Sequence, residues 1–306
     1  MKNKVIVVAG PTAVGKTKYA IELAKKNNGE IVSLDSVQVY KYLDIGSGKV
    51  TKAEMDGIPH YMIDVVEPSV NLNVKEFKDM AVKYIDDIIS REKTPILVGG
   101  TGFYIRAILF DTDFLEEDEK LHLKVREELY DELDKKGIEI LYNRLKEVDF
   151  ESYKKIPIGN VTRIIRALEF YKLHNFPISE HNLVEKAKES KYDYDFYVLN
   201  MDRAKLYDRI NKRVDKMIND GLLFEVKKLI DMGINKDSNS MKSIGYKELY
   251  DFCIDKNNFD INLFDDETKK ELENKIELIK KNSRNYAKRQ LTWFKAQKNI
   301  IRIKMN

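Results

Sequence analysis

Residues 10–17 read Gly10-Pro11-Thr12-Ala13-Val14-Gly15-Lys16-Thr17 and follow directly on the apolar run Val5-Ile6-Val7-Val8-Ala9. This is the pattern G-x-x-x-x-G-K-[ST] of a phosphate-binding loop, placed between a predicted strand and a helix predicted over 16–27. The glycines let the backbone curl so that consecutive N–H groups face one anion at the helix N-terminus. Lys16 adds a positive charge for the outer phosphate, and the Thr17 hydroxyl is a ligand for bound Mg²⁺. The stretch predicts a site for a diphosphate or a triphosphate.

Strand and helix signals alternate over the first ~110 residues, as in an open parallel sheet. The predicted strands are residues 4–9, 30–34, 60–65 and 95–98, and apolar residues at helical spacing predict a helix over 74–90. Ligands of such sheets bind at the carboxyl ends of the strands. We therefore expect three segments to surround one crevice: residues 10–17, 35–38 and 99–104.

The pattern turns helical from residue 116 to 190, returns to a strand at 194–199, and continues with a helix at 204–217 and further helices reaching Lys298. We predict an α/β fold with a P-loop NTPase-like parallel sheet core and helices on both faces. This core, with a helical C-terminal part, is assigned to residues 1–115 and 191–306. A helical insertion domain is assigned to residues 116–190.

Charge is distributed unevenly along the chain. The net charge is +3, but residues 269–306 carry twelve Lys or Arg and three Glu. Such a basic segment indicates either a polyanionic partner or a solvated helix face. Cys253 is the single cysteine, which excludes an internal disulfide, and no apolar run approaches the ~20 residues of a membrane span. We expect a cytoplasmic protein with no membrane contact.

Asp35 distinguishes this chain from an ordinary nucleoside triphosphatase. Those enzymes hold Mg²⁺ through an Asp that ends an apolar strand, whereas the run at 96–98 ends in Gly-Gly-Thr. Asp35 lies instead among Ser36, Gln38 and Tyr40, which is typical of a polar substrate-reading loop. A carboxylate there can act as a general base, and the alternative is an N-cap or a group behind the Mg²⁺ ligands.

Further motifs follow the phosphate loop in a defined order and extend to about residue 295. They are Asp35-Ser36-Val37-Gln38-Val39-Tyr40, Asp44-Ile45-Gly46-Ser47-Gly48-Lys49, Val98-Gly99-Gly100-Thr101-Gly102-Phe103-Tyr104, Arg163-Ile164-Ile165-Arg166-Ala167-Leu168-Glu169, residues 209–221, Ile244-Gly245-Tyr246-Lys247-Glu248 and Ala287-Lys288-Arg289-Gln290-Leu291-Thr292-Trp293-Phe294. The ordered set resembles the bacterial tRNA dimethylallyltransferase (isopentenyl-tRNA transferase) family. The phosphate loop alone is shared with many enzymes, but the ordered set is specific to this family.

The resemblance implies an activity and its substrates. It implies transfer of a dimethylallyl group from dimethylallyl diphosphate to N6 of the adenosine directly 3′ of the anticodon, in tRNAs that read codons beginning with U. Diphosphate is released, Mg²⁺ is the cofactor, and the anticodon stem-loop of tRNA is the partner of a protein that we expect to be a monomer. Because Cys253 is alone, we expect no zinc-finger extension of the kind found in eukaryotic relatives.

The same resemblance assigns the site residues. Residues 10–17 would hold the diphosphate, Thr17 the Mg²⁺, and Lys16 and Arg213 would stabilise the leaving group. Asp35 would accept the N6 proton while Thr101 positions the amine. The residues expected to contact tRNA are Asp35, Ser36, Val37, Gln38, Thr101, Lys124, Arg163, Arg166, Lys242, Tyr246, Lys247, Lys288 and Arg289.

Alternatives stay open at this point. Arg213 could form a helix-surface ion pair with Asp215, and Trp293 and Phe294 could pack in a core. A kinase would use the same loop for ATP and Asp35 as a base toward a hydroxyl. A non-catalytic RNA-binding module would keep only a relic of the phosphate site.

Overall fold

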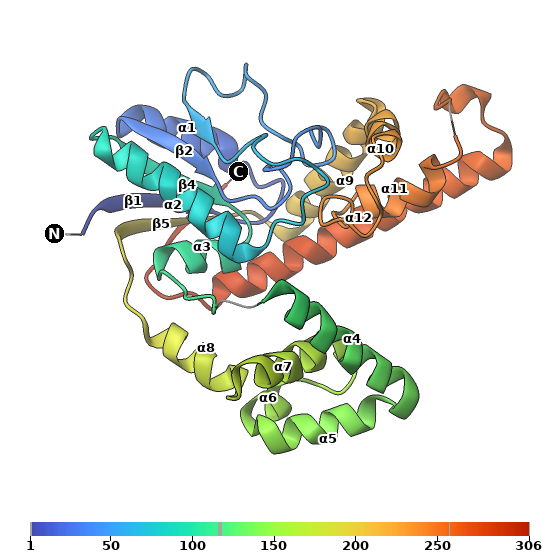
Figure 1. Ribbon diagram of the computed structural model, residues 1–306. Helices are drawn as coiled ribbons and strands as arrows, with labels where there is room; N and C mark the ends of the chain where they lie inside the picture. Colours follow the sequence, from blue (N-terminus) through green and yellow to red (C-terminus); the bar gives the residue numbers. More distant parts are fainter. Residues whose placement is uncertain (1, 116–117, 257, 306) are drawn as a thin grey trace. The chain divides into compact units, whose positions relative to one another are not determined.

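The computed structural model describes residues 2–115, 118–256 and 258–305 (Figure 1). The chain forms two compact units, Met1–Leu109 with Lys191–Asn306, and Phe110–Ser190. The elements follow in the order β1 (Lys4–Ala9), α1 (Lys16–Lys26), β2 (Gly29–Ser33), β3 (His60–Tyr61), α2 (Val74–Ser90), β4 (Thr94–Gly99), α3 (Gly102–Leu109), α4 (Glu119–Lys136), α5 (Ile138–Val148), α6 (Phe150–Lys155), α7 (Val161–His174), α8 (Ile178–Ala187), β5 (Asp193–Asn200), α9 (Arg203–Asn219), α10 (Leu222–Asp231), α11 (Tyr246–Cys253), a 3₁₀ turn (Ile261–Leu263), α12 (Asp266–Lys295) and β6 (Ile301–Lys304).

All the strand pairs of the first unit are parallel, and the strand order is β3-β2-β4-β1-β5-β6. The strand β1 therefore lies between β4 and β5, with the phosphate loop at its carboxyl end. The prediction of an α/β fold with a parallel sheet core is confirmed.

Helices cover both faces of the sheet at its central strands, where consecutive residues of β1 and β2 are buried. Ile6 and Val8 join a core cluster with α1, α9 and Ala287 of α12. Side chains alternate across a strand, so the equally buried Val5 and Val7 face the other side of the sheet. The helix α2 contacts β2 and β4 outside that cluster, which is the position expected when a right-handed crossover returns the chain from β3 to β4.

Two predictions about strands need correction. The strand predicted over 60–65 ends at Tyr61, because Met62 and Asp64 adopt positive φ angles of 62° and 56° that a strand does not tolerate. The terminal strand β6 was not expected. It pairs with β5 through the short alternating run Ile301-Arg302-Ile303-Lys304, which is too brief to give a clear periodicity.

The second unit, Phe110–Ser190, holds α4 to α8. Its core is an apolar cluster built from three of these helices, comprising Val125, Leu129, Leu141, Leu145, Ile164, Ile165, Ala167 and Leu168. These residues recur at helical spacing in the sequence, which is why this region reads as helical. Within the described ranges, no helix has both the length and the apolar character that a membrane span requires.

A buried carboxylate at the start of β2 stabilises the first unit. Glu30 is 2% exposed and accepts hydrogen bonds from Arg91 (2.8 and 2.6 Å), Lys93 (2.5 Å) and Tyr61 (2.8 Å). The bonds from Arg91, together with those from Lys93 and Tyr61, lower the pKa of Glu30 to about 2. The ionised group therefore stabilises the fold above its unfolded pKa, and this contribution is lost as the pH falls toward about 2.

We expect Glu30→Gln to lower the free energy of unfolding by about 1–3 kcal/mol at neutral pH, because the neutral amide removes the one charge that Arg91 and Lys93 share, although Arg91 keeps its ion pair with Asp87. Urea unfolding followed by circular dichroism measures the change. The difference from wild type should shrink as the pH is lowered through the acid range. The exposed Glu273→Gln serves as the control, and equal unfolding midpoints for Glu30→Gln and wild type would contradict the assignment.

Candidate functional site

A cavity of about 670 Å³ opens at the carboxyl ends of β1 and β2 in the first unit. Segments distant in the sequence contribute to it: the phosphate loop and α1, the loops after β2, and the helices α9 and α12. Its lining residues are Thr12, Ala13, Gly15, Lys16, Thr17, Lys18, Ile21, Glu22, Lys25, Asp35, Gln38, Ser47, Gly48, Glu54, Asp56, Gly100, Arg209, Arg213, Tyr286 and Gln290.

The phosphate loop has the backbone geometry that its glycines permit. Gly15 precedes α1 with a φ of 102°, a left-handed conformation that strains other residues. Val14 is fully buried in the core cluster and anchors the loop instead of lining the cavity. Lys16 folds back so that its Nζ donates to the carbonyls of Gly10 (3.1 Å) and Pro11 (2.9 Å).

Two buried cations and one carboxylate interact in the cavity. The pKa of Lys16 is lowered to about 8, chiefly by burial; the Asp35 carboxylate opposes this shift, and the Arg213 guanidinium adds to it. Burial also lowers the pKa of Arg213, again against the attraction of Asp35 and Glu54. Desolvated cations of this kind are stabilised by an added anion, so the cavity favours a negatively charged ligand.

Asp35 follows β2 and is held by its own turn. Its Oδ1 accepts the backbone N–H groups of Val37 (2.9 Å) and Gln38 (3.2 Å). Among the residues that the structure describes, its other oxygen, Oδ2, forms no hydrogen bond. The carboxylate is thus oriented by the main chain while one oxygen stays available to a substrate. Asp35 caps this turn and not a helix.

Arg213 reaches into the cavity from α9. Its Nη2 donates to the carbonyl of Ser47 (2.9 Å), and a Cβ on Gly48 would lie only 1.9 Å from that nitrogen. The alternative of an ion pair with Asp215 is wrong, because Asp215 pairs with Lys280 at 2.8 Å.

The helix α12 contributes two residues that sequence reasoning missed. Gln290 is buried; its Oε1 accepts from the N–H of Thr12 (2.9 Å) and its Nε2 donates to the carbonyl of Gly100 (3.0 Å). One turn earlier, the hydroxyl of Tyr286 lies 3.4 Å from Oγ1 of Thr101. Their i, i+4 spacing puts both side chains on one helix face, which is the signal that the sequence offered.

Of the other residues of the first unit that were predicted to contact tRNA, the basic side chains are exposed and the tyrosine is buried. Lys242, Lys247, Lys288 and Arg289 are exposed. Tyr246 is fully buried, so direct contact with tRNA does not fit it. Phe294 packs in the core, as the alternative proposed, and is 1% exposed, whereas Trp293 is half-buried with its ring against Gly102, where a Cβ would lie 2.2 Å from it.

In the second unit, Lys124 and Arg163 are exposed, whereas Arg166 belongs to a buried-carboxylate cluster. Glu169 is fully buried and accepts from Arg166 (3.0 Å) and from two nitrogens of Arg126 (2.8 and 3.0 Å). The sequence did not suggest Arg126. His122 also lies 3.0 Å from the Glu169 carboxylate, so this cluster joins three basic side chains of the second unit to one buried acid.

The cavity offers few protein donor atoms for a metal ion. Within the described parts of the chain, no group of three or more His, Cys, Asp or Glu side chains could hold a metal ion. Thr17 is exposed on the cavity wall and Asp35 lines the same cavity. A hydroxyl, substrate phosphate oxygens and water suit Mg²⁺, which keeps much of its hydration shell, so the site fits this ion.

Comparison with known proteins assigns the family. A family model described as IPP transferase matches residues 38–297. The chain belongs to this family. The match begins after the phosphate loop, so residues 10–17 support a phosphate substrate independently of the IPP transferase model.

Individual relatives of this IPP transferase agree over nearly its whole length. A tRNA dimethylallyltransferase of Acetivibrio thermocellus is 43% identical over 298 residues, which are 97% of this chain and 90% of that protein. The crystal structure of the tRNA isopentenylpyrophosphate transferase of Bacillus halodurans is 41% identical, with a TM-score of 0.68 over 99% of this chain and 90% of that one. A eukaryotic dimethylallyltransferase acting on tRNA is 30% identical, with a TM-score of 0.79 over 99% and 74% of the two chains.

The lowered pKa of Lys16 predicts a pH dependence of ligand affinity. The ammonium is charged below about pH 8 and neutral above it, so affinity for dimethylallyl diphosphate should fall above pH 8, by at most tenfold per pH unit. Titration calorimetry between about pH 7 and about pH 9.5 measures this. Lys16→Arg keeps its charge and should remove the inflection, whereas Asp35→Asn should move it to lower pH. An affinity independent of pH in the wild type would contradict the analysis.

Proposed function

We propose that this enzyme transfers the dimethylallyl group of dimethylallyl diphosphate to N6 of the adenosine directly 3′ of the anticodon in tRNA. One observation carries the proposal: the phosphate loop, Arg213 and Asp35 surround a single cavity. Its half-buried cations suit a diphosphate, and the Asp35 carboxylate, which is held by its turn, suits the amine that attacks. The relatives named above support the choice of substrates.

The reaction balances with the groups present. The bond between C1 of the dimethylallyl group and the diphosphate oxygen breaks, and diphosphate leaves with the electron pair. The nitrogen N6 forms the new bond to C1, and its proton passes to the Asp35 carboxylate. Loop N–H groups and Lys16 on one side, and Arg213 on the other, stabilise the negative charge that grows on the leaving oxygens.

Positioning is as important as proton transfer, because an exocyclic adenine nitrogen is a poor nucleophile. Thr101, next to the cavity-lining Gly100, is assigned to orient the amine, and Tyr286 orients the Thr101 hydroxyl. The amide of Gln38 lines the cavity and suits a base edge. Mg²⁺, held through the Thr17 hydroxyl and the phosphate oxygens, would supply neutralisation of the diphosphate charge.

The tRNA is proposed to bind by its anticodon stem-loop. An adenine stacked in that loop must be flipped out to reach Asp35 inside the cavity. On the first unit, the exposed Lys242, Lys247, Lys288 and Arg289 supply phosphate contacts. On the helical insertion, Lys124 and Arg163 are exposed, and Arg166 with Arg126 forms the cationic pair over Glu169.

A kinase reading fits less well. Phosphoryl-transferring P-loop enzymes hold Mg²⁺ with an Asp that ends a neighbouring strand. Here the two strands adjacent to β1 are β4 and β5, which end at Gly99 and Asn200, and the carbonyl of Gly100, directly after β4, accepts from the Gln290 amide. The position where such enzymes carry the metal-binding Asp is therefore occupied by an uncharged hydrogen bond between Gln290 and Gly100.

Incubation with radiolabelled dimethylallyl diphosphate, Mg²⁺ and unmodified tRNA tests the proposal. Label should enter the RNA, and a parallel reaction with ATP should show no hydrolysis. Lys16→Ala should abolish labelling, while the exposed Lys52→Ala should not change it. Hydrolysis of ATP coupled to transfer of phosphate, with unlabelled RNA, would favour the kinase.

Asp35→Asn should lower kcat by about 10²–10⁴-fold, because the amide cannot accept the N6 proton. Its oxygen can still accept the N–H groups of Val37 and Gln38, so the turn is kept. The Kd for tRNA, from filter binding, should stay within about threefold. The exposed Asp79→Asn is the matched control. An unchanged kcat would remove the general-base role.

A further inference from the structure

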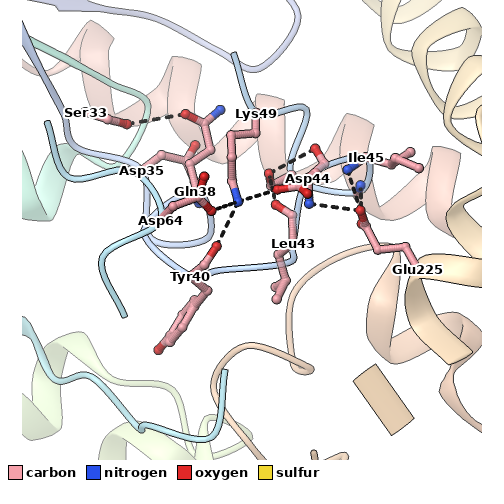
Figure 2. A network of polar contacts seen from close by, with 12 residues as sticks. Ser33, Asp35, Gln38, Tyr40, Leu43, Asp44, Ile45, Lys49, Asp64 and Glu225 are labelled. Atoms are coloured by element: carbon pink, nitrogen blue, oxygen red, sulfur yellow. Dashed lines mark hydrogen bonds and ion pairs between the residues drawn. The ribbon is translucent and has the colours of Figure 1, made fainter. Parts of the chain in front are cut away.

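Glu225, on α10, makes four hydrogen bonds without lining the cavity. Its Oε2 accepts from the N–H groups of Asp44 (2.9 Å) and Ile45 (2.8 Å), and its Oε1 accepts from the N–H of Gly46 (3.0 Å) and the hydroxyl of Tyr246 (2.7 Å). Figure 2 shows this carboxylate facing the backbone of the 44–46 segment. No ion pair to it occurs among the described Lys and Arg residues, so consecutive amide dipoles balance its charge.

The contacts require the residue types found there. A Cβ on Gly46 would lie 2.6 Å from the Tyr246 ring, so only glycine allows this approach. Burial and the neighbouring Glu225 carboxylate raise the pKa of Tyr246, which keeps its hydroxyl a donor. Three residues beyond the segment, Nζ of Lys49 donates to the Tyr40 carbonyl (2.9 Å) and to the Asp44 carboxylate (2.6 Å), which holds the chain at a second point (Figure 2).

Ser47 and Gly48, which directly follow the 44–46 segment, form part of the cavity wall. The carbonyl of Ser47 accepts from Arg213 and the carbonyl of Gly48 accepts from the Gln38 amide at 3.2 Å. Both backbone groups lie immediately after the three amides that Glu225 holds. The carboxylate therefore determines where two carbonyls stand, and these carbonyls orient two side chains of the cavity.

We propose that Glu225 is a positioning residue: by holding residues 44–46 it fixes the Ser47 carbonyl, which sets the Arg213 guanidinium against the diphosphate. The inference rests on the proposed function. Glu225 touches no substrate and acts through Arg213. A carboxylate suits this role because it only accepts, and all four of its partners are donors.

Glu225→Gln is the informative variant, since it keeps the shape of the side chain. In either orientation, its NH₂ group faces N–H groups of the segment and cannot accept from them. We expect the Kd for inorganic diphosphate, measured by calorimetry with Mg²⁺, to rise roughly 5- to 50-fold. In turnover assays the KM for dimethylallyl diphosphate should rise, while the KM for tRNA stays within about twofold.

A double-mutant cycle separates positioning from general support of the fold. Arg213→Met removes the guanidinium and keeps the aliphatic stem. If Glu225 acts through Arg213, then adding Glu225→Gln to Arg213→Met should change the Kd for diphosphate by less than about twofold. Tyr246→Phe keeps all three amide contacts and should have a much smaller effect than Glu225→Gln.

Three results would overturn the inference. One is an unchanged Kd for diphosphate in Glu225→Gln. A second is a loss of equal size with and without Arg213, which would indicate a purely structural role. The third is a wild-type chain that binds no diphosphate, in which case Arg213→Met would not change the binding measured by calorimetry. That outcome would remove the proposed function as well, and so is distinguishable from the other two.

Discussion

The desolvation of Lys16 and Arg213 is the constraint on which the site depends. Both cations lose water in the cavity, and both are attracted by the carboxylate of Asp35, with Glu54 adding to the attraction on Arg213. Taking charges out of water is unfavourable unless they are paired, so this arrangement is completed by an anion. In the reaction proposed above, a diphosphate supplies that anion, and its charge increases at the bridging oxygen as the allylic bond breaks. The cations thus bind the leaving group more strongly in the transition state than in the substrate.

The fold places these charges by combining two halves of the chain. The sheet brings the phosphate loop and the Asp35 turn to one edge, because β1 and β2 run parallel with only β4 between them. The return of the chain through β5 then adds α9 and α12 from the C-terminal half. Arg213 and Gln290 come from these helices, and Gln290 bonds to the N–H of Thr12 and the carbonyl of Gly100. Gln290 therefore ties the phosphate loop to the segment that follows β4.

The polar network around residues 44–49 shows how the IPP transferase chain departs from a generic phosphate-loop enzyme. The Gly46 and Gly48 positions admit the Tyr246 ring and the Arg213 guanidinium, respectively, at distances that a Cβ would prevent. The backbone of this loop is held by the Glu225 carboxylate at residues 44–46 and by the Arg213 guanidinium at Ser47. A guanidinium thereby occupies the side of the diphosphate opposite the phosphate loop, which suits departure of the diphosphate better than passage of a phosphoryl group.

The sequence by itself determined the elements whose signal is local. The phosphate loop, the buried strands at 4–9 and 95–98 and the helix at 74–90 each lie within one short segment, where spacing and residue type suffice. The motifs also named Asp35 and Arg213, but not what orients them. The tertiary structure alone paired Arg213 with Ser47, 166 positions away, and Glu225 with Asp44, 181 positions away. It also buried Tyr246 and ended the third strand at Tyr61. Such contacts depend on how distant segments pack, and no local pattern encodes the neighbour that a side chain will meet.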